Sequence, residues 1–254
     1  MIFAAGLGTR LYPLTRDTPK ALIELGAATL LEIALDRLTE AGCTRIVVNV
    51  HHHADRIVEF FERACPEGPG ATGEPDSPWS WRGAWVLISH EPDGPLETGG
   101  GLLHAAGLFR GDRTILLHNV DVISDIDLTA LAREHEASGK IATLAVNRRP
   151  SGRLLVFDED GLCGRVDSRT GVEEWARRPS NAEWRAAFTG VHAVSPRILG
   201  RLADRGVFSI VRSYLRLAAA GAGVMPFDVS GAAWMDVGTP GRLDAATRRL
   251  AGGK

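Results

Sequence analysis

The chain has 254 residues, of which 44% are hydrophobic and 24% are charged, a balance typical of a soluble globular protein with one large core. A formal net charge of −2 gives no indication of nucleic acid as a partner. No apolar run approaches the ~20 residues that cross a bilayer, and we expect no signal peptide before the first motif. Three cysteines without metal-ligand spacing indicate reduced thiols, so we expect a cytoplasmic protein without a membrane partner.

Strands and helices are predicted to alternate through residue 147. Short apolar, β-branched runs predict strands at 1–4, 45–50, 84–91, 114–121 and 140–146, and helical periodicity predicts helices at 29–42, 54–64 and 127–138, with a loop and a helix over 99–109. This alternation favours an α/β fold with a mostly parallel central sheet.

The pattern changes after residue 147. Residues 153–175 are predicted to form a hairpin with an Asp-Gly turn, followed by a strand at 186–196 and helices at 208–221 and 241–252. Earlier in the chain, the Pro- and Gly-rich segment 65–83 is interpreted as a surface excursion. Its tryptophans Trp79 and Trp81, with nearby Trp85, are assigned to packing in preference to a pocket lid or a subunit contact.

The most informative segment follows the first strand directly, where the chain runs into Gly6-Leu7-Gly8-Thr9-Arg10. Glycines after a strand expose backbone N–H groups and allow an anion to approach closely. The lysine and hydroxyl residue of a Walker loop are missing, and Leu11 stands where a dinucleotide fingerprint needs its third glycine. An ordinary tight turn is the alternative, but Arg10 and Lys20 on either side favour a polyphosphate ligand.

The stretch "AAGLGTRLYPLTRDTPKAL" (4–22) resembles the signature of sugar-1-phosphate nucleotidyltransferases. The resemblance covers nearly the whole chain, because "PLETGGG" (95–101), "HNVD" (118–121), "FTGVHAVSP" (188–196) and "WMDVG" (234–238) follow in the family's order. The chain is most similar to the short single-domain group that contains N-acetylmuramate-1-phosphate uridylyltransferase and mannose-1-phosphate guanylyltransferase-like proteins.

The resemblance implies a Rossmann-like nucleotidyltransferase fold, with helices on both faces of the sheet and no C-terminal β-helix. Residues 1–254 would form one domain, with a nucleotide-binding part at about 1–147 and a sugar-phosphate-binding part at about 148–254. The implied reaction joins an NTP (UTP or GTP) to a sugar 1-phosphate, with Mg²⁺ as cofactor, and releases an NDP-sugar and pyrophosphate. Such a product serves as a cell-wall or polysaccharide precursor, and we expect a monomer or small homo-oligomer.

The family motifs assign roles to individual residues of this chain. Arg10 and Lys20 are predicted to be catalytic, Asn119 and Gly190 to bind the sugar phosphate, and Asp121 and Asp236 to hold the metal. The nucleotide-binding residues implied by the motifs are Ala4, Ala5, Gly6, Gly8, Thr9, Arg10, Glu97, Thr98 and Gly99.

The residues themselves support the metal prediction and leave alternatives. Asp121 ends an apolar strand, and ligands of α/β sheets bind at the carboxyl ends of strands; a loop acid or helix cap is the alternative, which is assigned to Asp125 and Asp127. Mg²⁺ binds one or two carboxylates together with substrate phosphates, which suits a pairing of Asp121 with Asp236. Two such carboxylates should repel each other without the cation.

Other features either depart from the family or are rejected as sites. Residues 51–53 are three histidines, but neighbours on an extended segment point to opposite faces, so zinc is rejected and one histidine is a candidate to border the pocket. A mid-chain lysine motif of some relatives is absent near 158–178, and Arg165 is the candidate substitute. Two alternatives remain for the function: a catalytically silent sugar-nucleotide-binding regulatory subunit, and a cytidylyltransferase for a phosphorylated alcohol. The presence of all four charged site residues favours an enzyme.

Overall fold

The computed structural model describes residues 1–65, 79–111 and 113–252. The helices are α1 (Leu30–Glu40), α2 (Ala54–Ala64), α3 (Glu97–His104), α4 (Leu128–Ser138), α5 (Ile210–Ala219) and α6 (Pro240–Gly252), with 3₁₀ turns η1 (Thr9–Leu11), η2 (Lys20–Leu22), η3 (Ala105–Leu108) and η4 (Pro196–Ile198). The strands are β1 (Ile2–Phe3), β2 (Glu24–Leu25), β3 (Ala28–Thr29), β4 (Arg45–Val50), β5 (Trp79–Trp81), β6 (Ala84–His90), β7 (Ile115–Asn119), β8 (Val122–Ser124), β9 (Ala142–Asn147), β10 (Arg153–Asp158), β11 (Gly161–Asp167), β12 (Val172–Trp175), β13 (Trp184–Val194), β14 (Val224–Asp228) and β15 (Trp234–Asp236).

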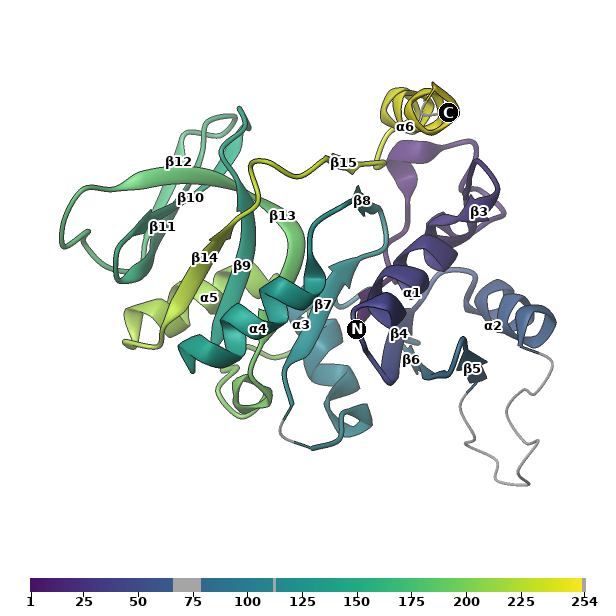
Figure 1. Ribbon diagram of the computed structural model, residues 1–254, viewed down its shortest axis with the longest axis horizontal. Coiled ribbons are helices and arrows are strands. Elements are labelled where there is room, and N and C mark those ends of the chain that lie inside the picture. The colour runs from purple at the N-terminus through teal and green to yellow at the C-terminus, as the bar shows by residue number, and fades with distance from the viewer. Residues whose placement is uncertain (66–78, 112, 253–254) are drawn as a thin grey trace.

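An 11-stranded mixed sheet forms the centre of the molecule (Figure 1), in the order β12-β11-β10-β13-β7-β1-β4-β6-β5, with β9 beside β13 and β14 beside β9. The run β7-β1-β4-β6 is parallel throughout, as is the pair β9-β14. The pairings of β10 to β13 are antiparallel, and these strands come from the region after residue 147. The predicted α/β fold is confirmed, but the described sheet is mixed and not mostly parallel, because four of its strand pairings are parallel and six are antiparallel. The alternating part of the sequence supplies most of the parallel strands.

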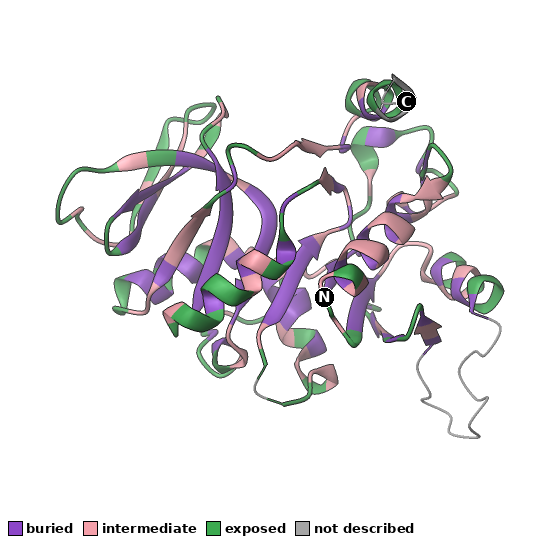
Figure 2. Ribbon diagram, viewed as in Figure 1, coloured by how far each residue is buried: buried purple, intermediate pink, exposed green. Residues whose placement is uncertain are grey.

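Two apolar clusters cover opposite faces of the sheet, because side chains alternate along each strand. Ile2, Ile46 and Val48 belong to the cluster that contains the apolar residues of α1 and α2. Their sequence neighbours Phe3 and Val47 belong to the cluster that contains residues of α3 and α5. Figure 2 shows the result as buried strands under helices whose outer sides are exposed. The predicted helices on both faces are thereby confirmed.

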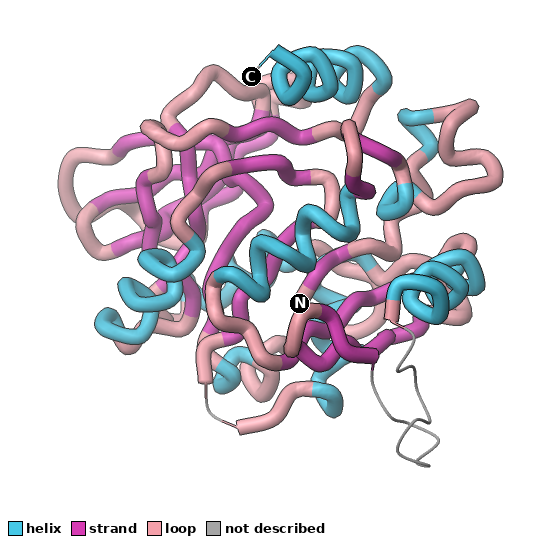
Figure 3. Tube along the Cα trace, turned by 45° about the vertical axis from the view of Figure 1, so that its right-hand side comes forward, coloured by secondary structure: helices cyan, strands magenta, loops and turns pink. Residues whose placement is uncertain are grey.

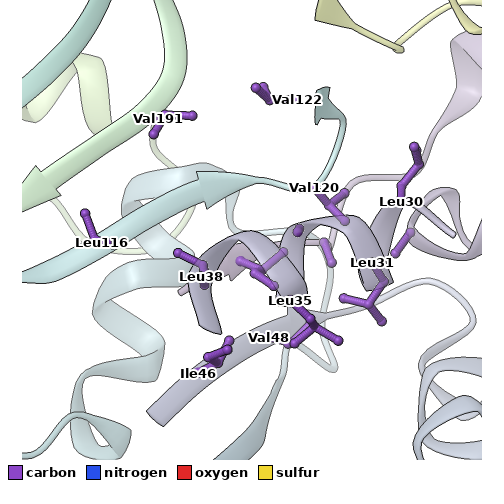
Figure 4. Packing of buried hydrophobic residues seen from close by; sticks show 14 of the residues in the cluster. Leu30, Leu31, Leu35, Leu38, Ile46, Val48, Leu116, Val120, Val122 and Val191 are labelled. Carbon is purple, nitrogen blue, oxygen red and sulfur yellow. The ribbon is translucent and has the colours of Figure 1, made fainter. Parts of the chain in front are cut away.

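Helix α1 shows how sequence and packing agree. Thr29 and Glu32 form a capping box, in which each side chain bonds the other residue's backbone N–H. Four leucines of α1 are buried in the same apolar cluster as Ile46 and Val48 of strand β4 (Figure 4). In Figures 1 and 3, α6 lies at one edge of the molecule, apart from the helices that pack on the central sheet. It is the last described element, and no β-helix occurs in the described part of the chain.

The structure corrects the interpretation of segment 65–83. Residues 66–78 lie outside the described residues, but Trp79–Trp81 form strand β5, which pairs with β6 and is not loop. Trp79 stacks on Phe61, and the Trp81 indole donates to Asp36 Oδ1 at 2.8 Å. Packing is therefore confirmed as the role of these two tryptophans, whereas Trp85 is half exposed.

Strands β8 and β14, like the short pair β2 and β3, had no prediction. Strand β14 contains Pro226, which lacks a backbone donor and argues against a strand in sequence; it is tolerated because β14 pairs only with β9. Strand β8 is too short for a periodic signal. Among the described helices, none combines the length and apolarity needed to cross a membrane.

Candidate active site

A cavity of about 430 Å³ opens where β1 and β7 end. Lys20, Asn119 and Asp121 contribute to its wall. Most of the predicted nucleotide-binding residues also line it: Ala4, Ala5, Gly6, Gly8, Thr9, Arg10, Glu97 and Thr98. The structure therefore brings the N-terminal glycine loop together with the start of α3, two segments far apart in the sequence.

Gly99 is the one predicted nucleotide-binding residue that does not line this cavity. It is buried behind the wall, and its backbone N–H donates to the Phe208 carbonyl oxygen at 2.9 Å. A Cβ atom at this position would lie 2.3 Å from the Phe208 ring. The glycine allows α3 to pack closely on the segment before α5, and its amide is not directed to a ligand.

The glycine loop has the geometry of an anion nest. Gly8 has a φ of 65°, a left-handed conformation that favours glycine, and a Cβ there would lie 3.0 Å from Thr15 Cγ2. The Thr15 hydroxyl donates to the Gly8 carbonyl oxygen at 2.8 Å and closes the loop. Within the described residues, no backbone acceptor bonds the amides of residues 6–9. These N–H groups are available to an anionic ligand.

A buried polar pair, which sequence reasoning missed, joins the two walls of the cavity. Asn49 accepts the Ala4 N–H at 2.8 Å and donates to Glu91 Oε1 at 2.7 Å. Glu91 Oε2 in turn accepts the Leu96 N–H at 2.8 Å, one residue before α3. Both side chains are almost fully buried. The available signal was a polar residue within or just after each of two apolar strands, at the carboxyl edge of the sheet.

A second cavity of about 360 Å³ adjoins the first and shares Arg10, Asn119 and Asp121 with it. The predicted residues Gly190 and Asp236 line it. Gly190 has a φ of 84°, and a Cβ on it would lie 2.6 Å from Asn119 Nδ2. The absence of a side chain at Gly190 therefore leaves room for the Asn119 amide at the junction of the cavities.

The two predicted metal carboxylates are brought together by backbone pairing. Strands β8 and β15 are antiparallel, with Asp236 opposite Val122. The ladder continues beyond them, since the Val237 N–H donates to the Asp121 carbonyl oxygen at 2.9 Å. Asp121 thus stands on the boundary of both cavities and Asp236 on the wall of the second.

Each carboxylate already has a cationic partner, contrary to the expectation of two charges that repel each other uncompensated. Lys20 forms an ion pair with Asp121, and Arg242 from α6 forms one with Asp236. The Arg10 guanidinium also lies beside Gly238, which donates its N–H to Asp236 Oδ1 at 3.3 Å. Each of the two carboxylates is therefore paired with a cation, and Arg10 adds a further positive charge to the site.

This donor set fits Mg²⁺ that is completed by substrate. Mg²⁺ binds through one or two carboxylates plus phosphates and water, and Asp121 and Asp236 are two carboxylates that line the same cavity. Among the described residues, no group of three or more His, Cys, Asp or Glu side chains forms a protein-only metal site. Substrate phosphates would have to supply the remaining ligands.

The other candidates have structural partners. His51 Nδ1 lies 2.6 Å from the Glu91 carbonyl oxygen, and His53 Nε2 lies 2.9 Å from the Arg16 carbonyl oxygen; none of the three histidines lines either cavity. Arg165 does line the second cavity, but its guanidinium makes two bonds of 2.9 Å to Glu174. Arg165, the predicted substitute for the missing lysine, is therefore held in an ion pair with Glu174 on the neighbouring strand β12.

The chain is similar to known proteins over nearly its whole length. The family model described as nucleotidyl transferase matches residues 1–252. The N-acetylmuramate alpha-1-phosphate uridylyltransferase of Caulobacter vibrioides is 35% identical, over 99% of this chain and 96% of its own. The mannose-1-phosphate guanylyltransferase catalytic subunit beta of Drosophila melanogaster is 26% identical over 94% of this chain, which spans 59% of that subunit.

Solved structures show the same fold. A Bacillus anthracis structure, provisionally assigned as a glucose-1-phosphate thymidylyltransferase, superposes with a TM-score of 0.75 at 18% identity and covers 98% of this chain and 93% of its own. HddC from Yersinia pseudotuberculosis gives a TM-score of 0.69 at 18% identity, covering 98% and 97%. Because the family model spans almost the entire sequence and a relative matches at 35% identity end to end, the chain belongs to the nucleotidyl transferase family.

Proposed function

We propose that this protein transfers a nucleotidyl group from an NTP to a sugar 1-phosphate, giving an NDP-sugar and pyrophosphate. The observation that carries the proposal is the junction of the two cavities, where the glycine loop and its cations meet the adjacent carboxylates. The relative matched over 96% of its own length is a uridylyltransferase, which favours UTP, with GTP second.

The proposed placement puts the NTP in the first cavity and the sugar 1-phosphate in the second. The loop amides and Arg10 would hold the leaving pyrophosphate. Lys20 would lie beside the α-phosphate, where it now pairs with Asp121. An oxygen of the sugar phosphate attacks the α-phosphorus in line, a new P–O bond forms, and the bond to the β-phosphate oxygen breaks. The electron pair leaves with pyrophosphate.

No general base is required for this reaction. The second pKa of a phosphomonoester is about 6, so the attacking oxygen is already ionised at neutral pH. The barrier is mainly electrostatic, because two polyanions must approach. Mg²⁺ held by Asp121 and Asp236 would neutralise phosphate charge and orient the reacting groups. The presence of these carboxylates with Arg10 and Lys20 favours an enzyme over a silent regulatory subunit.

The direct test is pyrophosphate release from a panel of UTP, GTP, CTP and dTTP against several sugar 1-phosphates, with and without EDTA. We expect turnover with UTP or GTP and a sugar 1-phosphate, abolished by EDTA and restored by excess Mg²⁺. Turnover with CTP and a phosphorylated alcohol alone would support the cytidylyltransferase alternative. Binding of nucleotides without turnover by any pair would contradict the proposal.

A further inference from the structure

Arg149 is a cation of the second cavity that has no counterion in the described part of the chain. It follows β9 by two residues and contributes to the cavity wall. No acidic side chain in that part lies within ion-pair distance of it, and its buried Nε atom has no hydrogen-bond partner there. Leaving a buried donor of a charged group unpaired is costly. An unpaired guanidinium of this kind therefore suggests an anionic ligand.

Two further arginines of this wall, and the sequence neighbour Arg148, have carboxylate partners, whereas Arg10 lines both cavities and is assigned to the NTP. Arg153 bonds Asp167 Oδ2 at 2.8 Å, and Arg165 makes its two bonds to Glu174. The neighbour Arg148 points elsewhere, stacked on Trp184 and bonded to Asp228 at 2.9 Å. Arg149 thus differs from Arg148, Arg153 and Arg165 in having no carboxylate partner among the described residues.

The guanidinium of Arg149 is held in a fixed orientation. It stacks on the Trp234 ring at 4.1 Å from the centroid, and the Trp234 indole N–H donates to the Thr189 carbonyl oxygen at 2.9 Å. Stacking occupies the face of a guanidinium and leaves its edge free to bind a phosphate through two bonds. The ring and its hydrogen bond therefore pre-organise the cation.

The position of Arg149 identifies which anion it would meet. Trp234 begins β15, and Asp236 ends it. Burial lowers the pKa of Arg149, while the Asp236 carboxylate raises it and Arg242 lowers it further. The guanidinium therefore lies within the electrostatic influence of the carboxylate that we propose holds the metal. The anion that must come closest to that metal from the second cavity is the attacking phosphate.

We propose that Arg149, stacked on Trp234, binds the phosphate of the sugar 1-phosphate and positions it for attack. This assigns to Arg149 the role that the sequence suggests for Arg165. The inference rests on the proposed function, since it takes the second cavity as the acceptor site. Arg149 then acts on acceptor binding and orientation, while Arg10 and Lys20 act on the NTP.

The test compares Arg149→Met and Arg149→Lys with Arg148→Met, a neighbouring arginine that also stacks on a tryptophan but lies outside both cavities. The readouts are calorimetric binding of a sugar 1-phosphate to each protein, and separate KM values for acceptor and NTP. For Arg149→Met we expect acceptor Kd and KM to rise about 10- to 100-fold, the range for losing charge-assisted bonds, with a change below about threefold in the NTP KM. Arg149→Lys should recover part of the loss, and Arg148→Met should match wild type.

The outcomes separate this inference from the proposed function. Wild-type protein that binds a sugar 1-phosphate but turns over no NTP would defeat the proposed function and leave the binding comparison decisive for Arg149. An unchanged acceptor Kd in a folded Arg149→Met protein would overturn the inference, as would a larger effect of Arg165→Met. If only acceptors bearing a carboxylate on the sugar lost affinity, the anion would be that carboxylate and the proposal would be wrong. Should Arg149→Met fail to fold, Arg149→Gln gives the same comparison.

Discussion

At the scale of single residues, Glu97 combines a strained backbone with a place in the first cavity. Its φ is +59°, in the left-handed region, and its side chain is exposed at the cavity wall. Such a conformation costs a non-glycine residue roughly 1–3 kcal/mol. We propose that this strain is retained because the glutamate side chain contacts the ligand.

We expect Glu97→Gly to be more stable than Glu97→Ala by about 1 kcal/mol, because glycine relieves the strain and alanine does not. Both variants should show a raised NTP KM, since both lose the carboxylate. Urea unfolding and steady-state kinetics of the two proteins check this. Equal stability of the two variants would show that the backbone at residue 97 carries no strain.

The ion pair of Lys20 with Asp121 reverses an expectation drawn from sequence. A carboxylate repelled by its neighbour would make Asp121→Asn more stable without metal. In the structure the partly buried Asp121 neutralises Lys20, whose side chain is 11% exposed. We therefore expect Asp121→Asn to lose about 1–3 kcal/mol of metal-free stability, the usual cost of removing a bond to a charged group.

A double-mutant cycle measures this pair. Lys20→Met combined with Asp121→Asn should be less destabilised than the sum of the two single variants, because neither charge is then left without its partner. The measurement is urea unfolding in EDTA. A gain of stability in Asp121→Asn would instead support mutual repulsion of the carboxylates.

At the scale of secondary-structure elements, the walls of the first cavity are joined by the Asn49–Glu91 pair. Glu91 accepts two hydrogen bonds, one from Asn49 and one from the backbone before α3. Glu91→Gln places an amide NH₂ against one of these donors, so one bond is lost in a buried environment. We expect a loss of about 1–3 kcal/mol of stability and a raised NTP KM, since β1 and α3 lose their connection.

Glu134→Gln provides the matched control, because Glu134 is exposed on α4 and lines neither cavity. Thermal unfolding and NTP KM should be unchanged in that variant. If Glu91→Gln lost stability but kept the wild-type NTP KM, the pair would support the core without shaping the cavity.

Elements with strong local signals were predictable from sequence, whereas those that depend on distant partners were not. Strand β4 and helix α2 begin and end as predicted, because one is a continuous β-branched run and the other has strong helical periodicity. Strand β14 exists through its pairing with β9, which no local pattern encodes. The presence of Pro226 even argues against a strand, because proline lacks a backbone donor.

The same distinction applies to the site. The placement of the glycine loop and the two aspartates at the cavity walls could be predicted, because each lies in a recognisable motif at the carboxyl end of a strand. The partners of these groups could not. Arg242 comes from α6 to Asp236, and Arg149 rather than Arg165 is left without a carboxylate among the described residues. Such choices depend on side-chain geometry across strands and are not carried by spacing in the sequence.

At the scale of the whole molecule, two buried histidines on neighbouring strands should make stability depend on pH. His118 on β7 and His192 on β13 are buried, and burial lowers their pKa values to about 4 and about 3. The unfolded chain takes up these protons below about pH 6.5, the ordinary histidine value, and the native protein does not until much lower pH. The unfolded state then binds more protons, so stability falls as the pH drops from about 6.5 toward 4.

We expect each imidazole to remove on the order of 1–2 kcal/mol of stability between pH 7 and pH 5. His118→Gln and His192→Gln should each flatten this dependence, as measured by urea unfolding at the two pH values. His135, whose pKa is also lowered by burial, is retained in both variants and contributes equally. Identical pH dependence in wild type and variants would show that these two histidines do not govern acid sensitivity.

In the proposed mechanism, the two cavities act as one reaction centre through Asp121 and Asp236. Groups that act through one bound ion are not additive in their effect on rate. We therefore expect Asp121→Asn and Asp236→Asn each to lose most Mg²⁺-dependent pyrophosphate release, and the double variant to be little worse than the worse single one. The most direct measurement is kcat/KM of wild type, both single variants and the double variant at saturating Mg²⁺. Full activity in either single variant, or losses that multiply in the double, would contradict a shared centre.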